Sequence, residues 1–187
     1  YMEIGKFKTA LSSKISTEIF DDGKNKLASV MIVIYGTEPT IIMTEKPDTM
    51  NFHAGEISFP GGKFDERDND ILDTALRETK EEIGLEVLRN KVIGQLKPVT
   101  TLNSGFKIIP FVSILDSMPH LRANYEVKTI LHIPMIPFLK TLADDPDPKH
   151  KSIQEMYTFT FKNKIVWGAS ARMLKQIVDL MSNQNLI

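Results

Sequence analysis

The chain contains no cysteine among its 187 residues. This absence excludes disulfide bonds, zinc sites with thiolate ligands and cysteine nucleophiles, and it agrees with a cytoplasmic location. No apolar run approaches the roughly 20 residues that a membrane-spanning helix needs, so no membrane partner is expected. An excess of one charge is lacking as well, because 23 basic and 24 acidic side chains leave a net charge of −1. That balance provides no basic surface of the kind that binds nucleic acid.

Length and pattern predict one domain of mixed α and β structure over residues 1–187. Tyr1, which precedes Met2, is interpreted as a residue added for expression. Because strands come first and a helix is inserted among them, a mixed sheet covered by helices is expected. The expected strands span 27–35, 41–44, 57–59, 92–96, 108–115, 129–132, 156–161 and 165–167. The expected helices span 6–20, 135–142, 169–181 and a segment from the acidic cluster 65–70 to Gly84.

The most informative segment is 77–82, Arg-Glu-Thr-Lys-Glu-Glu. Its acids Glu78, Glu81 and Glu82 are three or four positions apart, so on a helix they point to one side, where like charges repel. At about 100° per residue, Glu78 and Glu82 border an apolar stripe and Glu81 lies further round. Acids beside a buried face need a partner, and Arg77 alone cannot serve three of them.

Ligands that offer only oxygen are suited to Mg²⁺ or Mn²⁺, and such ions usually act together with substrate phosphates. The acidic segment therefore predicts metal-assisted cleavage of a phosphate-containing substrate. The alternative, a solvated acidic face, is less favoured because two of the acids border the buried stripe.

Residues 61–84 resemble the signature of the Nudix hydrolase superfamily, in which a Gly, five residues, a Glu and seven residues precede Arg-Glu-hydrophobic-x-Glu-Glu-x-Gly-hydrophobic. The matching positions are Gly62, Arg77, Glu78, Glu81, Glu82, Gly84 and Leu85. Asp68 stands where the signature has Glu, eight residues separate it from Arg77, and Thr79 replaces the hydrophobic residue. These departures resemble the form found in the coenzyme A diphosphatase subgroup, here Gly61-Gly62-Lys63, Asp68 and 74–84.

A second segment, 43–62, is similar to the coenzyme A motif of the same subgroup. Lys46 and Asn51 stand where that motif has arginines, and Glu56 stands where it usually has glutamine. Lysine keeps the charge of arginine but loses its two-pronged hydrogen bonding. Lys63 and Lys107 are the candidates to supply the missing charge.

The resemblance implies a Nudix-type α/β/α sandwich with a mixed central sheet and the Nudix loop-helix-loop. It implies hydrolysis of the diphosphate bond of coenzyme A or acyl-coenzyme A with Mg²⁺ or Mn²⁺, giving 4′-phosphopantetheine and adenosine 3′,5′-bisphosphate. The expected partner is thus a small nucleotide-like substrate. A homodimer is common in such relatives, although no feature of this sequence establishes one.

Residue roles follow from the motif positions. The expected metal ligands are Glu78, Glu82, Glu81 and the carbonyl of Gly62. Arg77 is expected to orient these acids, and Asp68 to cap the helix or to pair with Arg77. The general base stays open among Glu81, Glu126 and Glu155, with Glu126 preferred. The expected substrate-binding residues are Lys46, His53, Lys63 and Phe106, while His53 is equally compatible with a structural role, Phe106 with core packing, and Trp167 with filling the core.

Two other functions compete with the coenzyme A assignment. The same fold and reaction would serve another nucleoside diphosphate derivative such as ADP-ribose, which the changes at Lys46, Asn51 and Glu56 make credible. A non-catalytic nucleotide-binding module is the alternative of another class. Such modules tend to lose their acidic ligands, whereas this chain keeps Glu78, Glu81 and Glu82.

Overall fold

A computed structural model describes residues 4–18, 22–50, 54–101, 103–150 and 156–187. Its helices are α1 (Ile4–Leu11), α2 (Ile71–Ile83), η1 (Arg89–Lys91), α3 (Met135–Leu139), η2 (Pro148–His150) and α4 (Gly168–Asn183). Its strands are β1 (Lys26–Tyr35), β2 (Thr40–Glu45), β3 (Ile57–Ser58), β4 (Gly61–Lys63), β5 (Val92–Gln95), β6 (Val99–Thr100), β7 (Phe106–Leu115), β8 (Thr129–Pro134), β9 (Ala143–Asp144), β10 (Tyr157–Phe161) and β11 (Lys164–Val166).

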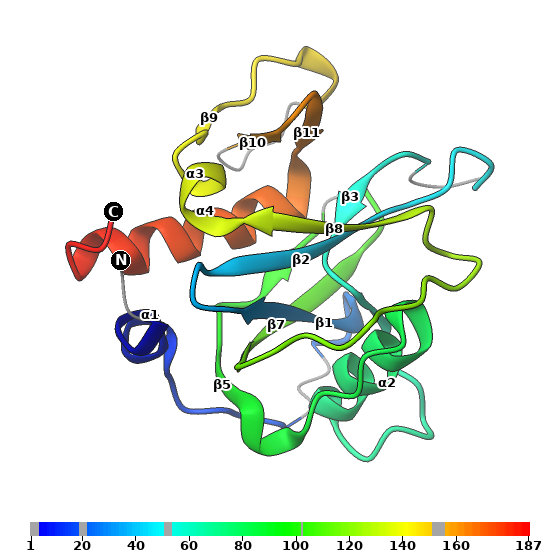
Figure 1. The fold of residues 1–187 in the computed structure, drawn as a ribbon. Coiled ribbons are helices and arrows are strands. Elements are labelled where there is room, and N and C mark those ends of the chain that lie inside the picture. The colour runs from blue at the N-terminus through cyan, green and yellow to red at the C-terminus, as the bar shows by residue number, and fades with distance from the viewer. Residues whose placement is uncertain (1–3, 19–21, 51–53, 102, 151–155) are drawn as a thin grey trace.

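The main sheet is mixed, as the sequence predicts. Its strands run in the order β3-β2-β1-β7-β5, with β4 paired to β1, β6 to β7 and β8 to β2 (Figure 1). The β1–β7 pair is parallel over its whole length, from Lys26 opposite Phe106 to Tyr35 opposite Leu115. Every other pair in this sheet is antiparallel. A smaller sheet, β11-β10-β9, lies beside it.

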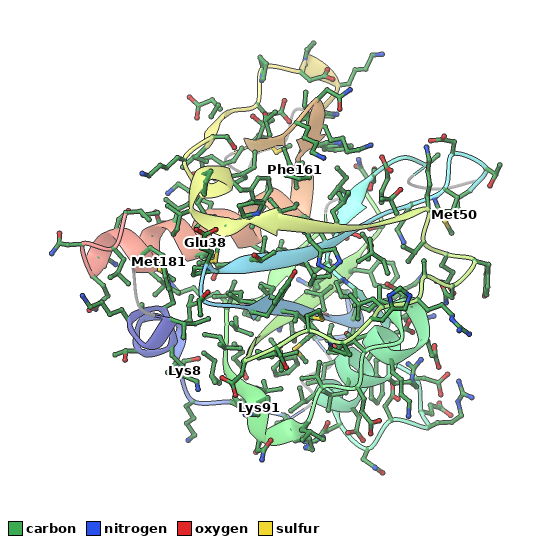
Figure 2. The ribbon with its side chains drawn as sticks, in the orientation of Figure 1. Lys8, Glu38, Met50, Lys91, Phe161 and Met181 are labelled. Carbon is green, nitrogen blue, oxygen red and sulfur yellow. The ribbon has the colours of Figure 1, made fainter. Side chains whose placement is uncertain are left out.

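Helices cover both faces of the main sheet, which gives the expected α/β/α layering. Because side chains alternate along a strand, Ile32 and Ile34 of β1 face one core, and Met31 and Val33 face the other. The first core is closed by α1 and α4, and Met181 lies where these two helices meet (Figure 2). The second core is closed by α2. No helix in the described ranges is long and apolar enough to cross a membrane.

The N-terminal helix is shorter than expected. α1 ends at Leu11, and residues 12–18 are not helical, whereas the prediction extends to residue 20. Serine hydroxyls compete with the helical backbone, and here Ser13 bonds to β5 instead: its amide donates to Ile93 O at 3.1 Å and its hydroxyl to Gln95 O at 3.1 Å. Residues 19–20 lie outside the described part of the chain.

Smaller differences occur at short elements. α3 ends at Leu139 rather than at residue 142, and the segment 143–150, for which no element is predicted, contains β9 and η2. Gly61 and Gly62 begin strand β4, which no predicted strand covers and which pairs with β1 between Ala28 and Val30. Strands β4 and β9, with three and two residues, are too short to show a clear periodicity.

An ion pair links the C-terminal hairpin β10–β11 to the main sheet, beside the core packing of Phe159 and Val166. Lys164 Nζ of β11 lies 2.6 Å from Glu45 Oε2 at the end of β2, and Glu45 is only 7% exposed. This hydrogen-bonded ammonium lowers the pKa of Glu45 below its ordinary value. The pair thus joins the hairpin that precedes Trp167 to the end of β2.

Replacing Lys164 with methionine should destabilise the fold by about 1–2 kcal/mol at about pH 7, because the buried carboxylate loses a charged donor. The lowered pKa means that the pair stabilises the fold above the ordinary pKa of 4.5 and that this stabilisation is lost as the pH falls through the lower folded-state value. The difference between the two proteins in urea unfolding should therefore be smaller at an acidic pH below 4.5 than at about pH 7. Lys140→Met, at an exposed position, is the control; an equal loss at both pH values would contradict the ion-pair explanation.

Candidate active site

The acidic helix α2 is well delimited by its ends. The Asp70 carboxylate caps the N-terminus by accepting from the Asp73 amide at 2.8 Å. Gly84 ends the helix with a left-handed φ of 69°, and its amide donates to Lys80 O at 3.0 Å. The N-cap is thus Asp70 within the expected acidic cluster, and the helix ends where the sequence predicts.

The three glutamates of α2 differ strongly in exposure. Glu82 is 4% exposed, the Glu78 side chain 16% and the Glu81 side chain 53%. This ranking agrees with the helical projection, in which Glu78 and Glu82 border the apolar stripe and Glu81 lies further round. Only two of the three acids are therefore forced to find a partner within the protein.

Arg77 is surrounded by carboxylates. Its Nε and Nη2 donate to the two oxygens of Asp68 at 2.7 and 2.9 Å, and Nη1 donates to Glu78 Oε1 at 3.0 Å and to Glu81 Oε2 at 3.3 Å. Asp68 also accepts from the Thr74 hydroxyl at 2.8 Å. The hydrogen bond to Asp68 is the largest cause of the raised pKa of Arg77, and its counterpart lowers the pKa of Asp68. Arg77 is placed to orient acids, and Asp68 is one of its partners rather than the helix cap.

Glu78 lies directly against strand β4. A Cβ atom added at Gly62 would come within 2.6 Å of Glu78 Cδ and 2.7 Å of Glu78 Oε1. A glycine is therefore required here, because any side chain would displace the carboxylate. The same absence of a side chain leaves the Gly62 backbone next to the Glu78 oxygens, where its carbonyl could join them around a cation.

Glu82 has the most perturbed acidity in the site. Burial raises its pKa to about 8, the nearby charge of Lys46 opposes this shift, and the charges of Glu78 and Glu126 add to it. A hydrogen bond from the Gly61 amide also favours the charged form. Burial likewise raises the pKa of Glu78. Negative charge thus exceeds positive charge at this point of the protein.

Glu126 reaches this cluster from a different part of the chain. Its loop is bonded to the end of α2, where the Arg122 amide donates to Ile83 O at 3.0 Å and the Asn124 amide to Glu82 O at 2.9 Å. The charge of Glu126 contributes to the raised pKa of both Glu78 and Glu82. The structure therefore brings together the α2 glutamates and the loop acid that the sequence analysis prefers.

The residues present fit a hard divalent cation. All the donors are oxygens, the glycine cradle keeps the Glu78 carboxylate next to the strand backbone, and the surroundings of the buried Glu82 disfavour its charged form, which a bound cation would stabilise. Within the described residues no three acidic or histidine side chains form a ready-made coordination cluster. Arg77 contributes to this lack of a coordination cluster, because its hydrogen bonds hold the carboxylates of Glu78 and Glu81.

A pocket of about 420 Å³ opens on the α4 side of the sheet, beside the part of β4 formed by Gly61 and Gly62, called here the glycine edge. It is lined by the predicted substrate-binding residues Lys46, Lys63 and Phe106, together with the backbone of Gly61 and Gly62. The candidate stand-in Lys107 lies elsewhere, at a separate small cavity. His53, Asn51 and Glu155 lie outside the described residues.

The sequence alone does not assign a functional role to several residues that lie at this site. Trp167 is only partly buried and lines the pocket with its ring stacked on that of His150, at 3.6 Å between centroids and 4° between planes. Lys149 and Arg172 line the pocket as well. Tyr125, 86% exposed, hydrogen-bonds to Glu126. No motif marks these positions, because their segments meet the site only through the fold of the C-terminal region and the 122–128 loop.

Comparisons with known proteins agree on one family. A family model described as the NUDIX domain matches residues 25–118. Uncharacterized Nudix hydrolases named NudL from Yersinia pestis and Yersinia pseudotuberculosis are 30% identical over 162 residues, which cover 84% of this chain and 81% of each relative.

Solved structures match at the level of the fold. A MutT/nudix family protein from Enterococcus faecalis superposes with a TM-score of 0.60 at 14% identity, covering 88% of this chain and 65% of that chain. The NUDIX domain of Shewanella oneidensis NrtR, in complex with ADP ribose, gives a TM-score of 0.52 at 15% identity and covers 65% of this chain and 82% of that one.

Replacing Gly62 with alanine should weaken Mn²⁺ binding at least about tenfold, because the added methyl would push the Glu78 carboxylate away. Isothermal titration calorimetry measures the affinity, and thermal unfolding verifies that the fold persists. Gly5→Ala in α1, where a Cβ would meet nothing within 4 Å, is the matched control. Undiminished Mn²⁺ affinity in a folded Gly62→Ala protein would argue against Glu78 as a ligand.

Proposed function

The chain belongs to the NUDIX family, and we propose that it hydrolyses the diphosphate bond of coenzyme A or acyl-coenzyme A in a reaction that depends on Mg²⁺ or Mn²⁺. The products would be 4′-phosphopantetheine and adenosine 3′,5′-bisphosphate. The observation that carries the proposal is the junction at Gly61 and Gly62. There the buried carboxylates of α2 meet the pocket lined by Lys46, Lys63 and Phe106. In this proposal the enzyme acts in the cytoplasm.

Glu78, Glu82, Glu81 and the carbonyl of Gly62 would hold the metal. A bound divalent cation neutralises the charge of a diphosphate and lowers the pKa of bound water. Arg77 orients Glu78 and Glu81 through its hydrogen bonds at 3.0 and 3.3 Å.

The loop acid Glu126 is the preferred general base. It would accept a proton from the water that attacks one phosphorus, while the bond from that phosphorus to the bridging oxygen breaks. Glu81 is the second candidate. It is about half exposed and bonded to Arg77, so its carboxylate is less available than that of Glu126.

Substrate binding would fall to the pocket residues. Lys46 lies close enough to Glu82 to influence its pKa, which suits a residue that contacts the phosphates at the reaction centre. Lys63 lines the pocket next to the Gly61-Gly62 edge, and Phe106 contributes an aromatic wall. The choice of coenzyme A rests on the motif in 43–62, and His53 belongs to the same motif.

ADP-ribose is the second candidate substrate, because Lys46 and Asn51 replace the arginines of the coenzyme A motif. A NUDIX domain of similar fold, that of NrtR, binds ADP ribose. The third alternative, a module without catalytic activity, is disfavoured by the retained carboxylates Glu78, Glu81 and Glu82.

Assays of the purified protein with Mg²⁺ or Mn²⁺ should give a kcat/KM at least about tenfold higher for coenzyme A or acetyl-coenzyme A than for ADP-ribose. Products identified by chromatography should be 4′-phosphopantetheine, or its acetyl form, and adenosine 3′,5′-bisphosphate. A preference for ADP-ribose would refute the coenzyme A assignment and keep the reaction type.

Glu82→Gln should lower kcat at least about 100-fold, because a buried carboxylate is replaced by a neutral group that binds Mg²⁺ and Mn²⁺ poorly. It should also abolish the rise in melting temperature that Mn²⁺ causes in the wild-type protein. The matched control is Glu86→Gln, just beyond the helix, whose side chain is 71% exposed. Full activity of Glu82→Gln would remove Glu82 from the ligand set.

A further inference from the structure

The pocket beside the acidic helix is strongly basic in a protein whose net charge is −1. The described lining residues include four Lys or Arg side chains, and Glu56 carries the sole carboxylate among them. The four cations are Lys46, Lys63, Lys149 and Arg172. Such a lining favours a ligand with more than one negative group.

The cations are spread over two distant ends of the pocket. Lys46 and Lys63 lie at the glycine edge, near β4. Arg172 lies at the other end, where its Nη2 donates to Thr100 O of β6 at 3.0 Å.

The sheet register gives the distance between these ends. Lys63, Ala28, Ile108 and Val99 lie opposite one another across β4, β1, β7 and β6. Three strand spacings separate β4 from β6, which is about 14 Å. The two phosphorus atoms of a diphosphate share a single bridging oxygen, so a ligand with two separate anionic groups suits this spacing better than one diphosphate does.

The remote end is built from fixed side chains. His150 stacks on Trp167, and its Nδ1 lies 2.7 Å from Asp145 Oδ2, whose side chain is 2% exposed. Lys149 precedes His150 in the chain and Trp167 immediately precedes α4, so the stacked rings place Lys149 near the start of that helix. The first turn of α4 has no side-chain cap, and Gly168 to Ser170 line the pocket, so the positive end of the helix dipole adds to the charge of Lys149 and Arg172.

Hydroxyl groups complete this wall. Thr101 and Ser104 line the pocket and lie 2.6 Å apart through their Oγ atoms. Between the two ends the lining is apolar, with Phe59 and Ile108 among its members. The pocket therefore offers a cationic end, an apolar middle and a second cationic end.

From this arrangement we propose that Lys149 and Arg172 form a second anion subsite, which binds a phosphate monoester on the nucleotide half of the substrate. The inference rests on the proposed function and narrows its substrate class. The scissile diphosphate lies at the Gly61-Gly62 edge, the nucleoside occupies the apolar middle, and a phosphate on its ribose reaches Lys149 and Arg172. Nucleotides with that additional phosphate are bound and cleaved in preference to those without it.

Coenzyme A and 3′-dephospho-coenzyme A differ only in this phosphate and provide the test. The wild-type kcat/KM should be at least about tenfold higher for coenzyme A, the effect expected of charge-assisted hydrogen bonds to one phosphate. In Lys149→Gln and Arg172→Gln the ratio of the two kcat/KM values should fall towards one. Lys162→Gln, at the β10–β11 turn outside the pocket, should keep the wild-type ratio. Equal kcat/KM values for the two substrates in the wild type would overturn the proposal.

A binding measurement separates this inference from the proposed function. By calorimetry without metal, adenosine 3′,5′-bisphosphate should bind at least about tenfold more tightly than adenosine 5′-monophosphate, and Lys149→Gln should reduce the difference. Lys149 is exposed, so this variant should fold even if Arg172→Gln does not. Preference for the bisphosphate without hydrolysis of coenzyme A would refute the proposed function and keep the subsite. Equal affinity for the two nucleotides, or an undiminished preference in Lys149→Gln, would refute the subsite.

Discussion

The close approach of strand β4 to helix α2 is the constraint on which the rest of the site depends. With glycine at position 62, the Glu78 carboxylate lies against the strand backbone, where a Cβ atom would come within 2.6 Å of it. On the other side of the sheet, the same two glycines border the basic pocket. The glycine edge thus lets carboxylates from one layer and cations from the other meet at one place. A bulkier residue at position 62 would separate the carboxylates of α2 from the cations of the pocket.

The charge distribution follows from that geometry. Arg77 satisfies Asp68 and binds Glu78 and Glu81, whereas the charged form of Glu82 is favoured by the Gly61 amide and the charge of Lys46. Its neighbours Glu78 and Glu126 make its ionisation less favourable. A protein that buried such a carboxylate for stability alone would gain nothing by adding two more acids. The arrangement is physically reasonable as a site for cations and phosphates.

Much of this could be predicted from the sequence because it is local. Helix α2, its end at Gly84 and the exposure ranking of its glutamates follow from 3.6-residue periodicity and glycine chemistry, and long strands such as β1 and β7 have clear apolar patterns. The remote wall of the pocket could not be predicted, because Lys149, Trp167 and Arg172 meet it only through tertiary packing. The N-terminal helix was overestimated for a related reason: Ser13 bonds to a strand 80 residues away rather than to its own helix. Trp167, expected in the core, instead forms part of the pocket surface.

The loop that carries Glu126 is bonded to the last two carbonyls of α2, at Glu82 and Ile83. Helix and loop therefore form one mechanical unit, in which a tilt of the helix carries the loop with it. The hairpin on the pocket side is attached separately, to β2 through Lys164 and Glu45. A shift of that hairpin would change the pocket wall at Trp167, whereas the bonds between helix and loop keep Glu82 and Glu126 in one unit. Ligands of different bulk could thus be accommodated while the reacting groups keep their relative positions.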